Sequence, residues 1–302
     1  MAQIKPAVVH SPWSARSLWR VELPNGRVLD TAGRALVMGV LNVTPDSFSD
    51  GGLFLDRDIA VKRGLAMAGE GADVLDVGGE STRPGSEATS PEEEKARVLP
   101  VIEALAARTR VPISIDTRNL AVAKEALDAG AQIINDVSAM RTSPEIGALA
   151  AERGAVVCLM HMQGTPGTMQ ARPSYGEVVR DVCDWLGGRV EAALRAGVAK
   201  ERIIVDPGFG FGKTPRHNLE LLRRLQEFHA LGCAVMVGTS RKSTIGAILG
   251  GAGPGERLYG TLATVACAVM AGCHMVRVHD VGPARDVVAT CEAVRLGMGW
   301  SE

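Results

Sequence analysis

Short apolar runs recur along this chain, and segments long enough to form helices separate them. The runs are continuous stretches of Val, Ile, Leu and Met rather than alternating apolar and polar residues, which is typical of strands buried on both faces. Eight such runs are present, at Ala35–Val43, Asp73–Val77, Pro112–Ile115, Ile133–Asn135, Val156–Met160, Ile203–Val205, Ala234–Val237 and Met275–Val278. The pattern therefore predicts repeated strand–helix units around a parallel sheet.

Eight strand–helix units in 302 residues predict an α/β fold of the (β/α)8 TIM-barrel type, with residues 35–302 as one barrel domain. A doubly wound parallel sheet is the weaker alternative. Ser90–Glu93 and Asn119 carry capping signals at two of the expected helix starts.

The residues before the barrel, 1–34, are expected to form an extension rather than a second domain. Within Arg20–Leu29, Asn25 and Gly26 lie between two short runs that contain β-branched residues. This arrangement predicts a β-hairpin with a two-residue type I′ turn. We expect the hairpin to act as a plug or lid on the barrel.

Nearly every apolar run ends in side chains whose burial costs free energy unless they bind something. The C-terminal ends of barrel strands meet at one mouth, where TIM barrels build their sites. Polar residues at strand ends also cap helices and pair with one another, so a single one would usually be structural. A set spread over the eight strands predicts a site instead. Its members are Asn42, Asp76, Asp116, Asn135, Asp136, His161, Asp206, Ser240, Arg241, Lys242, Arg277 and His279.

The chemistry of these side chains favours a flat, nitrogen-rich ligand and an anion. A buried carboxylate such as Asp206 can accept two hydrogen bonds from an amidine-like edge, for example that of a 2-amino-4-oxopyrimidine. Asp116 and Asn135 can bind the rest of such a ring. Lys242 follows the seventh strand and Arg277 lies on the eighth, where these barrels frequently hold phosphate. The neighbouring arginine at position 241 is explained equally well as an exposed or ion-paired residue.

Two long polar loops are expected beside the same mouth. Leu41–Gly52 includes the loop after the first strand, and Gly78–Gly85 follows the second. Loops of this length are more often functional than plain connections. Asp50 and Arg83 are the residues in them that we would test first.

Residue spacing excludes several classes of nucleotide and metal site. Gly208–Thr214 resembles a P-loop, but Pro207 occupies the position that the first glycine of that motif requires. His161 stands beside methionines and is interpreted as a hydrogen-bonded wall residue. The chain has no HxH or HExxH spacing, which argues against a transition-metal site built from histidines. Magnesium, which prefers oxygen ligands and phosphate, stays open.

The composition is typical of a globular protein, and its charge balance does not indicate a nucleic acid or an anionic membrane as a partner. With 33 basic and 34 acidic residues its formal charge is −1, so no overall field draws it to nucleic acid or to an anionic membrane. Met1–Ser11 lacks a signal-peptide pattern, and polar residues interrupt the long uncharged run Leu258–Val276. The six cysteines form no CxxC pair. We therefore expect a cytoplasmic location and free thiols.

Eight motifs resemble those of the dihydropteroate synthases, bacterial enzymes of the folate pathway, in order along almost the whole chain after the expected hairpin. They are Leu41–Gly52 (LNVTPDSFSDGG), Asp76–Gly85 (DVGGESTRPG), Ser114–Thr117 (SIDT), Asn135–Asp136 (ND), Met160–Thr165 (MHMQGT), Asp206–Lys213 (DPGFGFGK), Ser240–Ser243 (SRKS) and Arg277–Asp280 (RVHD). The resemblance implies a homodimeric, pterin-binding TIM barrel. Such an enzyme joins 4-aminobenzoate to 6-hydroxymethyl-7,8-dihydropterin diphosphate, with Mg²⁺ assisting, and releases 7,8-dihydropteroate and diphosphate.

The same resemblance implies roles for individual residues. It places the pterin at Asp116, Asn135, Asp206, Lys242 and Arg277. It places the diphosphate at Asn42, Thr82, Arg83, Arg277 and His279, and makes Asn42 a Mg²⁺ ligand. It places 4-aminobenzoate at Phe48, Pro84, Phe211 and Ser240. The expected catalytic residues are Asp50, Arg83, Lys242, Arg277 and His279.

The implied mechanism is dissociative: diphosphate leaves first, and the aromatic amine then attacks a cationic pterin methylene. Our hypothesis for Asp50 is that it stabilises the closed loops or this cation. One alternative is methyl transfer from methyltetrahydrofolate to a corrinoid protein, which needs no diphosphate site, so Arg83, Lys242, Arg277 and His279 argue against it. Another is a pterin-binding homologue without synthase activity. Damaged loops would favour that alternative, and both loops are intact in the sequence.

Overall fold

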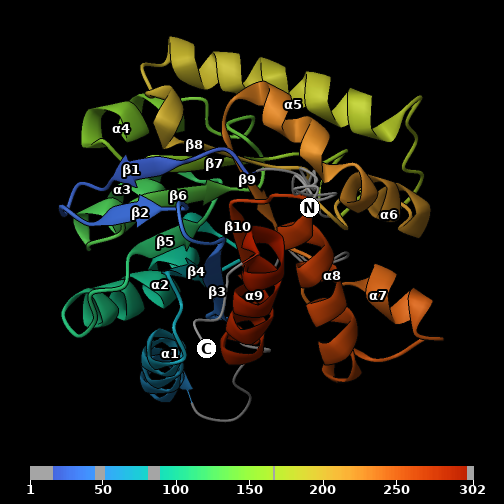
Figure 1. The fold of residues 1–302 in the computed structure, drawn as a ribbon. Coiled ribbons are helices and arrows are strands. Elements are labelled where there is room, and N and C mark those ends of the chain that lie inside the picture. Colours follow the sequence, from blue (N-terminus) through green and yellow to red (C-terminus); the bar gives the residue numbers. More distant parts are fainter. Residues whose placement is uncertain (1–15, 45–51, 81–88, 166, 298–302) are drawn as a thin grey trace, which may run out of the picture.

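Eight parallel strands close into a barrel in the computed structural model, which describes residues 16–44, 52–80, 89–165 and 167–297 (Figure 1). The strands are β3 (Leu36–Asn42), β4 (Val74–Gly78), β5 (Ile113–Asp116), β6 (Ile133–Asp136), β7 (Val156–Met160), β8 (Ile203–Asp206), β9 (Ala234–Val237) and β10 (Met275–Val278). Their order around the barrel is β10-β3-β4-β5-β6-β7-β8-β9, and all neighbours pair in parallel. The predicted TIM-barrel fold is confirmed.

Helices follow the strands and surround the barrel (Figure 1). They are α1 (Gly52–Gly69), α2 (Pro91–Ala106), α3 (Leu120–Asp128), α4 (Ile146–Arg153), α5 (Val178–Arg195), α6 (Pro215–Arg223), α7 (Ser243–Ile248), α8 (Leu258–Met270) and α9 (Val281–Leu296). Both predicted caps are present: the Ser90 hydroxyl accepts a hydrogen bond from the Glu93 N–H, and the Asn119 amide oxygen accepts one from the Ala121 N–H. Across the described ranges, no helix combines the length and apolarity that crossing a membrane requires.

Each strand contributes to two apolar layers, because successive side chains point to opposite faces. On β6, Ile133 belongs to the cluster inside the barrel together with Met38 and Cys158, whereas Ile134 belongs to the larger core under the helices. Asn135 follows Ile134 and shares the inward direction of Ile133. The barrel interior therefore changes from apolar to polar toward the C-terminal ends of its strands.

The hairpin at the N-terminus forms as predicted, but its turn does not. Strands β1 (Arg20–Glu22) and β2 (Val28–Asp30) pair antiparallel. Five residues separate them, and within this turn only Gly26 has a positive φ, of 77°. The Gly26 N–H donates to the Leu23 carbonyl oxygen at 2.9 Å, so Pro24 and Asn25 are the central residues of the turn. A type I′ turn centred on Asn25 and Gly26 needs a positive φ at both, and Asn25 does not have one. The predicted two-residue turn is therefore wrong.

This hairpin closes the N-terminal end of the barrel. The side chains of Trp19, Val21, Leu23 and Leu29 belong to the same apolar cluster as the inner barrel residues. The Trp19 indole N–H also donates to the Glu201 carbonyl oxygen at 2.8 Å, which ties the segment to the start of β8. The hairpin is thus a plug, and it lies at the end opposite the polar strand termini.

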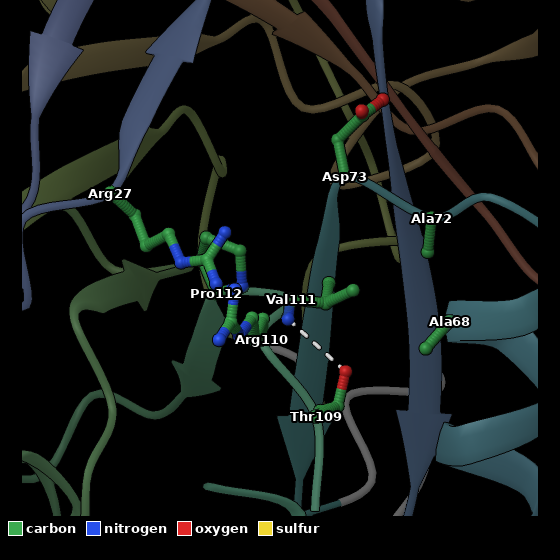
Figure 2. A pocket seen from close by; sticks show the side chains of 8 residues that line it. All are labelled: Arg27, Ala68, Ala72, Asp73, Thr109, Arg110, Val111 and Pro112. Atoms are coloured by element: carbon green, nitrogen blue, oxygen red, sulfur yellow. Dashed lines mark hydrogen bonds between the residues drawn. The ribbon is translucent and has the colours of Figure 1, made fainter.

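A cleft of about 470 Å³ lies at this N-terminal end, between the hairpin, the end of α1 and the loop before β5. Figure 2 shows Arg27 from the hairpin on one side of it, and Asp73 and Ala68 on the other. Asp73 is already paired, because Arg34 donates to both of its carboxylate oxygens, at 2.6 and 2.7 Å. The cleft is far from the strand ends that carry the predicted site and does not belong to that site.

Candidate active site

Arg277 is the centre of a polar cluster inside the C-terminal mouth of the barrel. Its Nε donates to Oδ2 of Asp76 at 2.6 Å, and its Nη2 donates to Oδ2 of Asp116 at 2.7 Å. The same Asp76 oxygen accepts a hydrogen bond from Nδ2 of Asn135 at 2.9 Å. Because Asp76 is fully buried, both donors contact a carboxylate that has no access to solvent.

Strand register explains how these four distant residues meet. Asp116 and Asn135 are register partners on β5 and β6, so their side chains lie next to each other on the inner surface. Asp76 on β4 is opposite Ser114, one inward position below Asp116. Only β3 separates β10 from β4, and the long Arg277 side chain spans that distance. The fold thus brings two predicted carboxylates, an amide and a guanidinium together.

Asp206, at the end of β8, adds a third carboxylate to the mouth, and this one is buried. Its Oδ1 accepts a hydrogen bond from the Gly208 N–H at 2.7 Å, which fixes the direction of the carboxylate. Gly208 has a φ of 70°, and a Cβ at this position would lie 1.8 Å from the His161 carbonyl oxygen. Only glycine is compatible with this turn.

Lys242 lies between Asp206 and the loop that follows β8. Its Nζ donates to the carbonyl oxygen of Phe209 and lies 4.5 Å from the ring centroid of Phe211, a cation–π distance. Burial lowers the pKa of Lys242 to about 8, and the Asp206 charge opposes this shift. At neutral pH the ammonium group is still mostly protonated.

Burial also controls the charge of the carboxyl groups here. It raises the pKa of Asp116 to about 7, although Arg277 acts in the opposite direction. It raises the pKa of Asp206 as well, against the effect of Lys242. For Arg277 burial is outweighed, and its carboxylate neighbours raise its pKa. Buried carboxyl groups of this kind gain stability from any ligand that donates N–H groups to them.

His279 and Ser240 form a pair at the edge of the mouth. The Nδ1 atom of His279 lies 2.9 Å from the Ser240 hydroxyl oxygen, which also accepts a hydrogen bond from the His279 backbone N–H. Burial and the nearby charge of Arg277 lower the pKa of the His279 imidazole to about 4. This imidazole is therefore neutral at pH 7, and it can donate a hydrogen bond to an anion but adds no positive charge.

Two polar strand ends have structural roles. Arg241 forms a two-point ion pair with Asp280, at 2.6 and 3.1 Å, as one of its two interpretations expected. The Asp136 carboxylate accepts hydrogen bonds from the backbone N–H groups of Ser138 and Met140, at 2.7 and 2.6 Å. Met140 has a φ of 59°, so Asp136 supports an unusual turn.

Some predicted site residues cannot be placed around this mouth. Phe48, Asp50, Thr82, Arg83 and Pro84 lie outside the described residues. Asn42 is the last residue of β3, partly buried and opposite Gly78 of β4. The predicted residues that the fold does gather at the C-terminal end are Asn42, Asp116, Asn135, Asp206, Phe211, Ser240, Lys242, Arg277 and His279.

Asp76 is the residue that sequence reasoning left out of the binding set. Its place at a strand end marks it as a candidate, but its two contacts depend on a strand register that the sequence does not reveal. Asp76 Oδ1 and the hydroxyl of its register partner Ser114 are buried and have no hydrogen-bond partner in the described ranges. These two atoms extend the hydrogen-bonding surface below the Arg277 cluster.

The described residues contain no group of three or more His, Cys, Asp or Glu side chains arranged to hold a metal ion. Asn42 offers one neutral amide oxygen at the mouth. This donor set does not fit an ion held by the protein alone. It fits Mg²⁺ that takes most of its ligands from a bound phosphate group and water.

Comparisons with known proteins agree with this chemistry. The family model described as "Pterin binding enzyme" matches residues 38–279. The dihydropteroate synthase of Escherichia coli (strain K12) is 51% identical over 259 residues, which cover 85% of this chain and 90% of that protein. A structure of Xanthomonas albilineans dihydropteroate synthase with 4-aminobenzoic acid matches with a TM-score of 0.86 and 44% identity, covering 92% of this chain and 99% of that one. A structure of the Xanthomonas enzyme in complex with 7,8-dihydropteroate matches with a TM-score of 0.82 and 42% identity, covering 91% and 98%.

Proposed function

This chain belongs to the pterin binding enzyme family and acts in folate biosynthesis as a dihydropteroate synthase, and from that premise we propose roles for its residues. The reaction joins 6-hydroxymethyl-7,8-dihydropterin diphosphate to 4-aminobenzoate. One observation carries the assignment of its site, namely the convergence of Asp76, Asp116, Asn135 and Arg277 inside the C-terminal mouth.

The pterin ring binds at the buried carboxyl groups. Its amino and ring N–H groups donate to Asp116 and Asp206, and Asn135 binds the remaining polar edge. The raised pKa values of both aspartates support this role, because ring donors recover stability that burial removes from the charged carboxylates. Arg277 flanks the ring and bridges Asp76 and Asp116 through its hydrogen bonds, and Lys242 contacts the ring from the side of the β8 loop.

The diphosphate binds beside the ring, toward His279. Arg277 supplies a guanidinium group there, and the neutral His279 imidazole supplies a hydrogen bond. Thr82 and Arg83 complete this set by the family resemblance. Bond cleavage leaves negative charge on the departing diphosphate, so cations that are already in place lower the barrier.

Mg²⁺ is the proposed cofactor, and Asn42 is its protein ligand. The single amide oxygen fits an ion that the diphosphate brings with it. When bound, the ion neutralises charge on the leaving group. The tests are loss of turnover on chelation, its recovery with Mg²⁺, and a lowered Mg²⁺ affinity of the diphosphate complex in Asn42→Ala.

The aminobenzoate binds outside the pterin, with Phe211 and Ser240 among its contacts. Phe211 already packs against Lys242, so the aromatic amine would meet a wall that is fixed relative to the pterin pocket. Phe48 and Pro84 complete the wall by resemblance. Asp50 is proposed to stabilise the closed loops or the pterin cation, and unchanged turnover and Michaelis constants in Asp50→Asn would contradict this role.

We further propose that the protein is a cytoplasmic homodimer. Its six cysteines are free, as in a reducing compartment. Tyr259 on α8 is 81% exposed and Ile248 on α7 is 55% exposed, so the α7–α8 region offers apolar surface to a second copy. Sedimentation that shows only monomer at micromolar concentration would contradict the dimer.

The pterin pocket is tested by Lys242→Ala. Calorimetry with the dihydropterin diphosphate should show a dissociation constant raised at least about tenfold, because the variant removes the ammonium group proposed to contact the ring and one of the charges that favour the Asp206 carboxylate. Lys95→Ala is the matched control, since Lys95 of α2 forms its ion pair with Glu125 of α3 and contacts none of the described residues of the proposed pterin pocket. An unchanged dissociation constant in Lys242→Ala would contradict the assignment.

A further inference from the structure

Lys213 is a buried lysine that the proposed reaction does not use. It follows the glycine-rich loop after β8, and its residue is only 3% exposed. Its Nζ lies 2.8 Å from Nδ1 of His161 and donates to the carbonyl oxygens of Gly208 and Phe211, at 3.0 and 3.1 Å. A lysine ammonium has three N–H groups, and here each of them has an acceptor.

His161 is held as the acceptor in this contact. Burial lowers the pKa of its imidazole to about 2, so the ring is neutral and its Nδ1 can accept from the ammonium. The rings of Trp185 and His161 pack in a T-shaped arrangement, with centroids 4.9 Å apart. Burial also lowers the pKa of Lys213, and the Asp206 charge opposes that shift. Three acceptors and a nearby carboxylate together favour the charged lysine.

These contacts fasten the loop after β8 to the segment after β7. The loop contains three glycines with positive φ, Gly208, Gly210 and Gly212, so its backbone has little preference for one shape. Two further residues from the segment after β7 contact the loop. The Tyr175 hydroxyl donates to the Gly212 carbonyl oxygen at 2.7 Å, and the Gln170 side-chain amide donates to the Gly210 carbonyl oxygen at 2.6 Å. Lys213 is the member of this set that contacts both His161 and the loop carbonyls.

The opposite side of the same loop faces Lys242. The Phe209 carbonyl accepts a hydrogen bond from Lys242, and the Phe211 ring stacks on its ammonium group. Phe211 is therefore held at two points: its carbonyl oxygen accepts a hydrogen bond from Lys213, and its ring contacts the ammonium group of Lys242. A shift of this loop changes the place of both the pterin-side ammonium and the aromatic wall.

We propose that Lys213 is a positioning residue for the synthase reaction: by binding His161 and the β8-loop carbonyls, it fixes Phe209 and Phe211, and through them Lys242. This inference rests on the proposed role of Lys242. It gives His161 and Lys213 a role in ligand binding, beyond the stability of the pocket wall and of the loop.

The test compares Lys213→Met with the parent enzyme, well below the unfolding temperature of both. Methionine keeps much of the unbranched stem and removes the three donors. We expect the dissociation constant of the dihydropterin diphosphate and the Michaelis constant of 4-aminobenzoate to rise about tenfold or more, because displaced site groups lose productive geometry. A purely structural lysine would lower the unfolding temperature and leave both constants of the folded protein unchanged, and that result would overturn the proposal.

A pair of His161 variants keeps the test decisive if Lys213→Met does not fold. Asparagine places an acceptor close to the position of Nδ1, whereas leucine removes it, so His161→Asn should stay near the parent and His161→Leu should weaken pterin binding. Equal binding by the two variants would contradict the proposal. Lys242→Ala is titrated alongside: if it binds normally, the pocket assignment itself fails, and if it binds weakly while the Lys213 and His161 variants bind normally, only this inference fails.

Discussion

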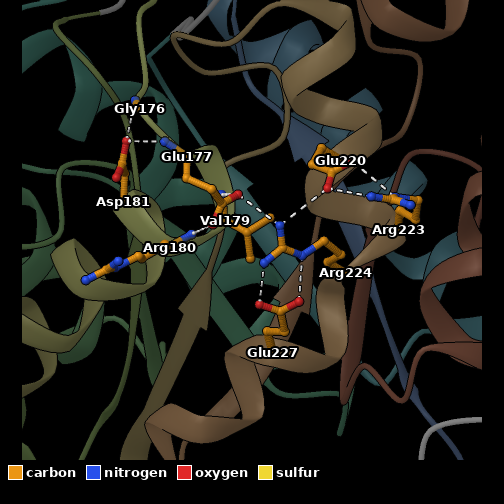
Figure 3. A network of polar contacts seen from close by, with 9 residues as sticks. All are labelled: Gly176, Glu177, Val179, Arg180, Asp181, Glu220, Arg223, Arg224 and Glu227. Atoms are coloured by element: carbon orange, nitrogen blue, oxygen red, sulfur yellow. Dashed lines mark hydrogen bonds and ion pairs between the residues drawn. The ribbon is translucent and has the colours of Figure 1, made fainter.

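Two arginine-centred networks in this molecule use the same ion-pair chemistry with opposite results. On the surface, Arg224 donates to Glu227 through two bonds of 2.6 and 2.7 Å and to Glu177 at 2.9 Å, between α5, α6 and the short 3-10 helix Leu225–Leu231 (Figure 3). At the barrel mouth, Arg277 binds Asp76 and Asp116 at similar distances. Bond lengths alone would not distinguish structure from function.

The difference lies in what burial does to the acids. In the surface network, hydrogen bonds from Arg224 lower the pKa of Glu227, and those from Arg223 lower that of Glu220, so both acids are stable as carboxylates. In the mouth, burial raises the pKa of Asp116 to about 7 despite its arginine. The surface acids are satisfied by their partners, whereas the mouth keeps acids that a ligand can still stabilise. Acids whose charged form a ligand can still stabilise therefore distinguish the functional network from the structural one.

The largest effect should follow from Arg277→Met. Removing the cation leaves Asp76 and Asp116 without their partner inside the barrel, which should lower the free energy of unfolding by about 3 kcal/mol. Dihydropteroate formation should fall at least about 100-fold, because the leaving diphosphate loses a preorganised cation. Urea unfolding and product formation measure the two effects. Turnover within a few-fold of the parent would remove Arg277 from the site.

A medium effect is expected in the pH dependence of pterin binding. Asp116 has an ordinary pKa of 3.8 that folding raises to about 7, so its contribution to stability is complete below pH 3.8 and is lost as pH rises through about 7. Ring N–H groups favour the carboxylate, so binding releases this proton, and the affinity should rise with pH up to about 7. Calorimetry with 6-hydroxymethylpterin, which lacks phosphate groups, measures this directly.

Asp116→Asn is the control for that profile, because an amide does not titrate. Its pterin affinity should be lower and nearly independent of pH over the same range. If the pterin affinity of the variant rises with pH as steeply as that of the parent, a group other than Asp116 releases the proton. The raised pKa of Asp116 would then not distinguish the mouth from the surface network.

The smallest effect should follow from Arg224→Met. Exposed ion pairs contribute little to stability and are screened by salt, so turnover should stay within about twofold of the parent and the small loss of thermal stability should shrink at high salt. Melting curves at low and high salt, with the Arg277→Met protein alongside, provide the measurement. A loss of turnover comparable to that of Arg277→Met would mean that the two networks do not differ in the way described.

Much of the fold was predictable, because a TIM barrel repeats one simple pattern. Continuous apolar runs located the eight strands, and the Ser90 and Asn119 caps located two helix starts. The hairpin turn differs from the prediction because Pro24, whose fixed φ suits the first central position of a turn, places the turn one residue earlier than the Asn25–Gly26 dipeptide indicates. A local dipeptide signal was thus overruled by its immediate neighbour.

The site was predictable in residue types and not in partnerships. Asp116, Asn135, Asp206, Lys242 and Arg277 could be found at strand ends because buried polar groups there need a purpose. Asp76 accepts hydrogen bonds from both Asn135 and Arg277 because of the strand register, and His279 is neutral because it is buried. Neither strand register nor burial can be read from a short motif. The contacts of Lys213 with His161 and the loop carbonyls could not be predicted for the same reason.

The most direct test of the account is product formation by the purified protein. The dihydropterin diphosphate and Mg²⁺ are supplied with and without 4-aminobenzoate, while diphosphate release is measured and 7,8-dihydropteroate is identified by mass. We expect the complete mixture to yield both products in equal amounts and the Arg277→Met protein to yield almost none. Pterin binding without dihydropteroate formation by the parent protein would contradict it and would favour a homologue that binds pterin without catalysing the reaction.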